Sequence, residues 1–428
     1  MRLFKTADPG FDAAFDAFLA EARGSPADVE AAVNDVLAGV RAEGVDAVLR
    51  YTHAFDGVAL TADTLRVSDE EIAAGAADCP APVRRALAFA AARIRDYHQR
   101  QRPTDAWFTD DAGVGLGWRW TPLDAVGIYV PGGRAAYPST VLMNAIPAGV
   151  AGVGRIAMVT PPGRLRPAVL AAAVEAGVRE IWRIGGAQAV AALAYGAGPI
   201  RAVDKIVGPG NAYVTAAKRG VYGVVGIDSL AGPSEIVVVA DAANDPAWIA
   251  ADLLSQAEHD PDAQSILITD DVDFARAVAA TVEAQLTVLA TGRDAGQSWR
   301  DHGAVVIAPL DRAPGLVDRI APEHVEFAVA DPEALADRVR HAGAIFLGRY
   351  APEAIGDYVA GSNHVLPTSR AARFSSGLST TDFMKRTSIV KCDAAAFAAL
   401  AEATEILANA EGLPAHARSI GIRRNRAG

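Results

Sequence analysis

Hydrophobic residues in the first hundred positions recur at three- and four-residue spacing, with charges on the opposite face. This period covers residues 29–51 and 70–102 and predicts amphipathic helices. Pro80 and Pro82 interrupt the second stretch, which predicts that it divides into two helical pieces. We expect residues 1–120 to form a mainly helical region that packs on the domain after it.

From about residue 125, short apolar runs alternate with helical stretches. This alternation predicts β-α-β units and parallel sheets. The first series predicts strands at residues 125–130, 155–159, 180–184 and 205–207. A second series predicts strands at residues 236–240, 265–269, 304–308, 325–329 and 344–347.

The sequence thus predicts an α/β protein with two Rossmann-like parallel-sheet modules, a helical N-terminal region and a helical C-terminal tail. The expected divisions are residues 1–120, 121–233, 234–380 and 381–428. Open α/β sheets bind ligands beyond the carboxyl ends of their strands, so the loops there are where we look for chemistry. These loops are residues 131–138, 185–188, 208–211 and 231–235.

Composition narrows the function classes. The formal net charge is −11, and no cluster of Lys and Arg offers a surface for a phosphate backbone, so we expect no nucleic-acid partner. Cys79 and Cys392 are the two cysteines of the 428-residue chain and form no C-x-x-C motif, which favours a reducing compartment.

Two features of the sequence argue against insertion into a membrane. The first residues lack the apolar core of a signal peptide. The most apolar stretch, residues 141–159, is interrupted by Asn144, Pro147 and Arg155 and fits a buried helix that runs into a strand. We expect a cytoplasmic protein without membrane contact.

Two pairs of residues are candidates for chemistry. Gln256 and His259 lie three apart at the end of a predicted helix and so share a face, which suits either a metal site or a histidine at the helix C-terminus. Gln is an uncommon zinc ligand. Glu323 and His324 precede a predicted strand and suit either a base with its partner or a solvated loop.

Other candidates are less defined by pattern alone. Asp357 suits a ligand, a helix cap or a loop charge, and His364 suits a structural role equally well. Glu411 and His416 lie in a tail whose charge could serve solubility alone. The Gly-rich segments within the candidate loops suit phosphate contacts or tight turns, but no G-x-G-x-x-G or P-loop motif is present.

Taken together and in order, these segments resemble the histidinol dehydrogenase family. The matching segments are VGIYVPGG (126–133), PSTVLM (138–143), GGAQA (185–189), KIVGPGNAYV (205–214), AGPSE (231–235), DLLSQAEHD (252–260), APEH (321–324), GDYVAGSNHVLP (356–367), RFSSGL (373–378), FMKRTS (383–388) and EGLPAHA (411–417). They cover most of the chain from about residue 120 onward. Ser362 departs from the Pro that many members carry there, but it has no assigned role.

The resemblance implies a role for each candidate residue. Glu323 and His324 would be the catalytic pair. A zinc ion would be held by Gln256, His259, Asp357 and His416. The substrate would contact these six residues together with Ser234 and Glu411. NAD would contact Tyr129, Gln188 and Asn211.

The resemblance also implies a reaction. The family oxidises L-histidinol through L-histidinal to L-histidine, the last step of histidine biosynthesis, and uses two NAD because two hydrides leave. Residues 121–233 would bind NAD, and residues 234–380 would carry zinc and the catalytic pair. The family is homodimeric with shared active sites, so the tail with Glu411 and His416 would reach the partner subunit.

Three alternatives remain open from the sequence. A paralogous NAD-dependent dehydrogenase of another small polyol would keep the scaffold without needing Glu411. A zinc hydrolase would use Glu323 to activate water without NAD. A nucleotide-binding protein without catalytic activity would not need the Glu323 and His324 pair.

Overall fold

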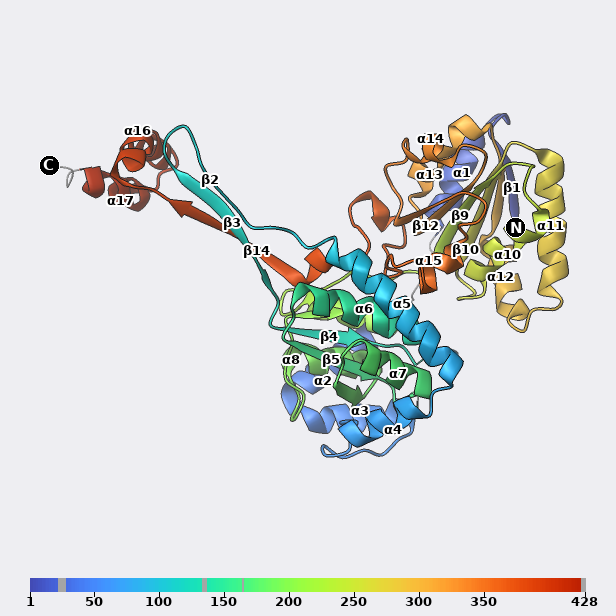
Figure 1. The fold of residues 1–428 in the computed structure, drawn as a ribbon, viewed down its shortest axis with the longest axis horizontal. Helices are drawn as coiled ribbons and strands as arrows, with labels where there is room; N and C mark the ends of the chain where they lie inside the picture. Colours follow the sequence, from blue (N-terminus) through green and yellow to red (C-terminus); the bar gives the residue numbers. More distant parts are fainter. Residues whose placement is uncertain (22–27, 133–136, 164, 425–428) are drawn as a thin grey trace.

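The computed structural model describes residues 1–21, 28–132, 137–163 and 165–424. Figure 1 shows two α/β bodies and an arm that extends away from both of them. Each body is built on a parallel sheet with helices on both faces, which confirms the predicted fold class. Residues 133–136 of the predicted loop 131–138 and residues 425–428 of the tail lie outside the described residues.

The first module is a five-stranded parallel sheet in the order β6-β5-β4-β7-β8. Its strands are β4 (Ala125–Tyr129), β5 (Arg155–Thr160), β6 (Glu180–Arg183), β7 (Lys205–Val207) and β8 (Gly226–Ile227). One face packs against α4 (Asp69–Ala77), α5 (Ala81–Gln99), α6 (Pro138–Ala151) and α7 (Pro167–Glu175). The other face packs against α2 (Asp28–Glu43), α3 (Val45–Asp56), α8 (Gly186–Tyr195) and α9 (Ala212–Val221).

The expected division of residues 70–102 into two helices is confirmed, because α4 ends at Ala77 and α5 begins directly after Pro80. The apolar stretch 141–159 is buried helix α6 followed by strand β5, as the sequence predicts. Within the described residues, no helix has the length and apolar content that crossing a bilayer requires.

The second module is a six-stranded parallel sheet in the order β1-β11-β10-β9-β12-β13. Its strands are β1 (Arg2–Lys5), β9 (Glu235–Ala240), β10 (Gln264–Thr269), β11 (Ala304–Ile307), β12 (His324–Ala328) and β13 (Ala344–Leu347). One face packs against α1 (Phe11–Ala20), α13 (Ala313–Ile320) and α14 (Pro332–Ala336). The other packs against α10 (Pro246–Ala257), α11 (Val272–Leu286) and α12 (Gly292–His302). Helix α15 (Glu353–Tyr358) follows β13.

The first twenty residues correct the expected N-terminal region. They belong to the second module, because β1 pairs with β11 and α1 buries Phe11, Phe15 and Phe18 in that module's core. A partner strand three hundred residues away leaves no local period in the sequence, so the pattern of residues could not place it. The helices from α2 to α5 do pack on the first module, as expected.

The arm is a three-stranded antiparallel sheet that carries two helices at its far end (Figure 1). Its strands are β2 (Ala106–Thr109), β3 (Gly115–Pro122) and β14 (Met384–Lys391), and its helices are α16 (Ala394–Ala410) and α17 (Pro414–Arg424). The tail predicted as helical therefore begins with a strand. Three short 3-10 turns complete the described elements: η1 (Leu310–Arg312), η2 (Ala371–Arg373) and η3 (Thr380–Phe383).

Candidate active site

A turn with a left-handed residue brings Glu323 and His324 to the start of β12. Helix α13 ends at Ile320, and Ala321 then adopts a φ of 51°. This backbone conformation costs a residue with a β-carbon roughly 1–2 kcal/mol, so the surrounding packing must hold it in place. The side chains of Glu323 and His324 are buried, and His324 is the first residue of β12.

The site lies at the amino edge of the second sheet, whereas the loop rule points to the carboxyl edge. Strand β12 lies beside β9, which begins at Glu235, so the starts of these two strands meet. Helix α10 runs back across the sheet after β9 and ends at the same edge with Gln256 and, two residues beyond its end, His259. The candidate loop 231–235 precedes β9 and so borders this edge as well.

The His324 imidazole lies between a backbone carbonyl and two carboxylates. Its Nδ1 is 3.2 Å from the Glu235 carbonyl oxygen, which can only accept, so Nδ1 carries the hydrogen and donates it. Nε2 then holds the lone pair, and it has no hydrogen-bond partner among the described residues. Burial lowers the pKa of His324 to about 3, which keeps the ring neutral. A neutral buried imidazole with a free Nε2 can accept a proton.

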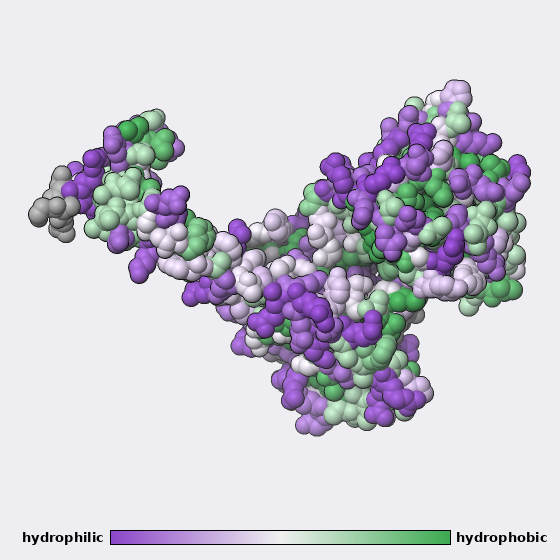
Figure 2. Space-filling view, turned by 45° about the horizontal axis from the view of Figure 1, so that its top comes forward, coloured by the Kyte–Doolittle hydropathy of each residue, from purple (hydrophilic) through white to green (hydrophobic). Residues whose placement is uncertain are grey.

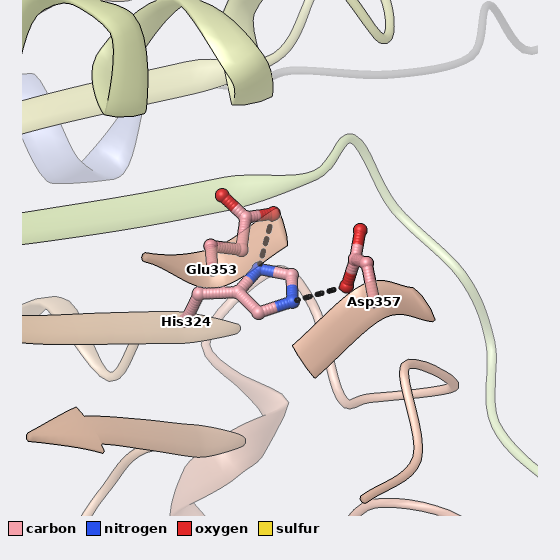
Figure 3. Close-up of side chains that lie close together, drawn as sticks. All are labelled: His324, Glu353 and Asp357. Carbon is pink, nitrogen blue, oxygen red and sulfur yellow. Dashed lines mark ion pairs between the residues drawn. The ribbon is translucent and has the colours of Figure 1, made fainter. Parts of the chain in front are cut away.

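Two carboxylates of α15 approach the same ring from opposite sides (Figure 3). Glu353 Oε1 lies 3.5 Å from Nδ1, and Asp357 Oδ1 lies 3.7 Å from Nε2. Glu353 and Asp357 are four residues apart, so they lie on one face of the helix. The ring therefore lies between the carboxyl groups of α15 and the start of β9, which accepts its hydrogen bond.

Glu323 is held by the start of β9. Its Oε2 accepts a hydrogen bond of 3.1 Å from the Glu235 backbone N–H and lies 3.8 Å from the His324 Nδ1. Burial raises the pKa of Glu323 well above its ordinary value, and the charges of Glu235 and Asp357 raise it further. A carboxylate form of Glu323 therefore depends on a positive charge nearby.

Gln256 and His259 contact one another as their spacing predicts. The Gln256 Nε2 lies 3.0 Å from the His259 Nδ1, and the Gln256 side chain is fully buried while His259 is exposed. Helix α15, which carries Asp357, packs against α10. The charge of His259 lowers the pKa of both His324 and His364, so it acts across the same site.

Several buried polar atoms of this site have no hydrogen-bond partner among the described residues. They are the Gln256 Oε1, the His324 Nε2, the His364 Nε2 and both carboxylate oxygens of Glu353. Buried polar groups are rarely left unpaired, so atoms like these call for a ligand. Nitrogen and oxygen donors of this kind fit Zn²⁺.

A second set of candidate ligands overlaps with the implied zinc ligands. One nitrogen of His324 and one oxygen each of Glu353 and Asp357 lie within 4.8 Å of one another, a spacing that could hold a metal ion. Asp357 belongs to both sets. The two sets differ in the role of His324, which is a base beside the implied zinc ligands and a ligand itself in the second set.

The structure does not bring Glu411 and His416 to the rest of the site within one chain. Glu411 directly follows α16 and His416 lies in α17, and both residues are exposed on the arm (Figure 1). Ser234, in contrast, immediately precedes β9 at the site's edge and is partly buried.

The three residues implied to contact NAD lie at the carboxyl edge of the first sheet. Tyr129 ends β4, and its hydroxyl accepts a 3.0 Å hydrogen bond from the Gly186 N–H, two residues before the buried Gln188. Asn211 follows β7 and caps α9 by accepting from two backbone N–H groups. The strand order reverses between β4 and β7, which is where open α/β sheets bind ligands.

Comparisons with known proteins identify the family of the chain. A family model described as histidinol dehydrogenase matches residues 20–424. The chain belongs to the histidinol dehydrogenase family. It is 74% identical over 423 residues to a histidinol dehydrogenase of Caulobacter vibrioides, covering 99% of both chains. It is 61% identical over 420 residues to one of Rhodospirillum rubrum, covering 97% of both.

A solved structure supports the fold. The crystal structure of a histidinol dehydrogenase from Elizabethkingia anophelis superposes with a TM-score of 0.94 at 35% identity, covering 99% of this chain and 98% of that one. The resemblance in the sequence motifs is thereby confirmed. Family membership makes the chain an oxidoreductase of histidine biosynthesis.

The sequence analysis did not single out three carboxyl groups near His324, and it gave His364 no role in the site. Glu353 was not considered, although its spacing from Asp357 is a helical signal that could have found it. Asp252 and Glu326 form a pair of carboxyl groups. Burial is the main cause that raises the pKa of Glu326 to about 9 and that of Asp252 to about 6. His364 had no distinguishing pattern, and burial lowers its pKa to about 4.

Proposed function

We propose that this chain oxidises L-histidinol through L-histidinal to L-histidine, with two NAD molecules and a zinc ion. The observation that carries the proposal is the buried, neutral His324, whose Nε2 has no hydrogen-bond partner among the described residues and faces Asp357. Removing hydride from an alcohol requires a base for the hydroxyl proton, and this nitrogen is one. The relatives named above carry the matching substrate in their names.

His324 would act in both oxidation steps. In the first step, Nε2 takes the proton of the substrate hydroxyl while a hydride leaves the carbon that bears this hydroxyl. The aldehyde must then be hydrated, because its remaining hydrogen leaves as hydride from the diol. Glu323, adjacent in sequence and 3.8 Å from the ring, would take a proton from that water.

Gln256, His259, Asp357 and a second copy's His416 would hold the zinc ion, which would bind the imidazole and amine nitrogens of the substrate and fix its position. A positive charge at that place would favour the ionised form of Glu323, whose pKa burial raises. Ser234 and Glu411 would contact the substrate at its edges. Tyr129, Gln188 and Asn211 would contact NAD, which supplies the hydride acceptor.

The arm supports a homodimer with shared sites. It extends away from both modules and exposes apolar side chains, some of which appear as green patches in Figure 2. These include Trp107, Phe108, Val390, Ile406 and Leu407. An exposed apolar group of this kind favours burial against another chain. Docking of the arm on a second copy would carry Glu411 and His416 to that copy's site.

Mixing two inactive variants tests the shared site. His324→Ala removes the base from one module, and His416→Ala removes a ligand from the arm, so each homodimer should be inactive. After unfolding and refolding together in equal amounts, about a quarter of wild-type activity should return, because half of the dimers are mixed and each has one intact site. The two variants carry different affinity tags, so that mixed dimers can be isolated by purification on both tags in turn. No activity in these mixed dimers would contradict the shared site.

Substrate identity separates the proposal from its rivals. We expect the absorbance of reduced NAD to increase when histidinol and NAD are added, and to increase much more slowly with other small polyols at the same concentration. A faster rate with another polyol would favour the paralogous dehydrogenase. Hydrolysis of an ester or amide without NAD would favour the zinc hydrolase. The cytoplasmic location and the domain limits near residues 120, 233 and 380 belong to the same proposal.

A further inference from the structure

A buried ion pair lies beside the loop 208–211, away from the catalytic site. Lys218 in α9 and Asp228 just after β8 have side chains only 2% and 4% exposed, and the Lys218 Nζ lies 2.5 Å from the Asp228 Oδ1. Burying two charges removes them from water, and such a pair adds little net stability compared with apolar residues of the same size. Its value to the protein must therefore lie in the positions that it fixes.

Lys218 and Asp228 form hydrogen bonds with both backbone groups of Gly208, its carbonyl oxygen and its N–H. The Lys218 Nζ donates to the Gly208 carbonyl oxygen at 2.6 Å. The Gly208 N–H donates to the Asp228 Oδ2 at 2.7 Å, and the Ser229 N–H donates to Oδ1 at 2.7 Å. One residue of the loop is thus held from both sides by charge-assisted hydrogen bonds, which are stronger than neutral ones.

Gly208 is also pressed against the end of β4. Its φ is 112°, and a β-carbon there would lie only 2.3 Å from the Tyr129 carbonyl oxygen. Asn211 follows three residues later and caps α9, the helix that carries Lys218. The ion pair therefore fixes Gly208 between Tyr129 and Asn211, at the point where the strand order of the first sheet reverses.

We propose that Lys218 and Asp228 are positioning residues that hold the loop 208–211 in the shape that receives NAD. They set the affinity for the dinucleotide and leave the chemical step at His324 unchanged. This inference rests on the proposed function, since it takes Tyr129 and Asn211 as the NAD contacts. Preorganising a binding loop raises affinity by removing the cost of ordering it.

The first module offers a matched control at its opposite edge. Arg155 at the start of β5 and Glu180 at the start of β6 form a bidentate pair with two contacts of 2.8 Å, and their side chains are 14% and 20% exposed. This pair ties the same sheet together at the amino ends of its strands. Breaking it should disturb the module without touching the loop 208–211.

The test compares Lys218→Met/Asp228→Asn with Arg155→Met in the full-length chain. The double variant removes both charges, and the Asn amide oxygen still accepts from the Gly208 N–H. We expect its KM for NAD and its calorimetric Kd for NAD to rise about tenfold or more, with kcat and the KM for histidinol within about twofold of wild type. Arg155→Met should leave the KM for NAD within about twofold.

Three results would overturn the inference. One is an NAD affinity of the double variant that changes no more than that of Arg155→Met. Another is a fall in kcat with an unchanged KM for NAD. If the unmodified chain reduces no NAD with histidinol, the proposed function fails, and this inference fails with it. Should the double variant not fold, Lys218→Gln keeps a donor on α9 and is judged by the same measurements.

Discussion

Replacing His324 with Ala separates its two candidate roles. The change removes the Nε2 acceptor, which faces Asp357, and leaves the side chains of Gln256, His259 and Asp357 in place. If His324 is the base, turnover falls while the zinc content stays the same. If His324 is a ligand together with Glu353 and Asp357, zinc is lost as well.

The size of the effect follows from what the ring contributes. A positioned general base speeds proton transfer by about 10²–10⁴-fold, which is roughly 3–5 kcal/mol of transition-state stabilisation. Among the described residues, the ring makes one hydrogen bond, from Nδ1 to the Glu235 carbonyl, so the loss of this bond should cost the fold about 1–3 kcal/mol. We therefore expect a folded, zinc-loaded protein with kcat reduced by about 10²–10⁴-fold.

The assay measures kcat together with zinc per subunit after gel filtration. His259→Ala is the comparison, because it removes an implied ligand and should lower both the zinc content and the rate, with partial recovery in excess zinc. The reasoning is refuted if His324→Ala loses its zinc and regains its rate when zinc is added.

Three further predictions follow from contacts around the same sheet. Glu353→Ala should lower kcat about tenfold, since one of the two carboxyl groups flanking His324 is lost, and Glu353→Gln should recover much of this loss. A kcat of Glu353→Ala equal to that of the wild type in steady-state assays would contradict this role. Phe15→Ala should lower the free energy of unfolding in urea by about 3–5 kcal/mol, because the ring is fully buried in the second module; a loss below about 1 kcal/mol would place residues 1–20 outside that core. Burial raises the pKa of Glu326 from 4.5 to about 9, so the folded chain binds the extra proton and its stability falls as the pH rises between these values. Glu326→Gln cannot ionise and can still donate to Asp252, so urea unfolding at pH 6 and pH 9 should show a smaller loss of stability at pH 9 than in wild type; an equal loss would count against a buried proton on Glu326.

The sequence predicted most of what is local. Strands β7 and β13 have the expected limits, and α10 begins at Pro246 as expected, because each has its own period and its own flanking turn. The contact between Gln256 and His259 followed from helical spacing. The residue types of the site were therefore visible before the fold was known.

What the sequence could not supply is non-local. Strand β1 is four residues long and gains its place only from pairing with β11. Strand β14 pairs with β3 across more than 260 residues, so the arm was expected as a helical tail. The edge of the second sheet that carries the site depends on where α10 ends and where β12 begins, and the loop rule pointed to the other edge.

The measurement that tests the central claim most directly is the number of NAD molecules reduced per histidinol consumed. The account predicts two, with histidine as the product, with the activity lost on chelation and restored by zinc. One NAD per histidinol with accumulating aldehyde, or full activity in a metal-free protein, would contradict it.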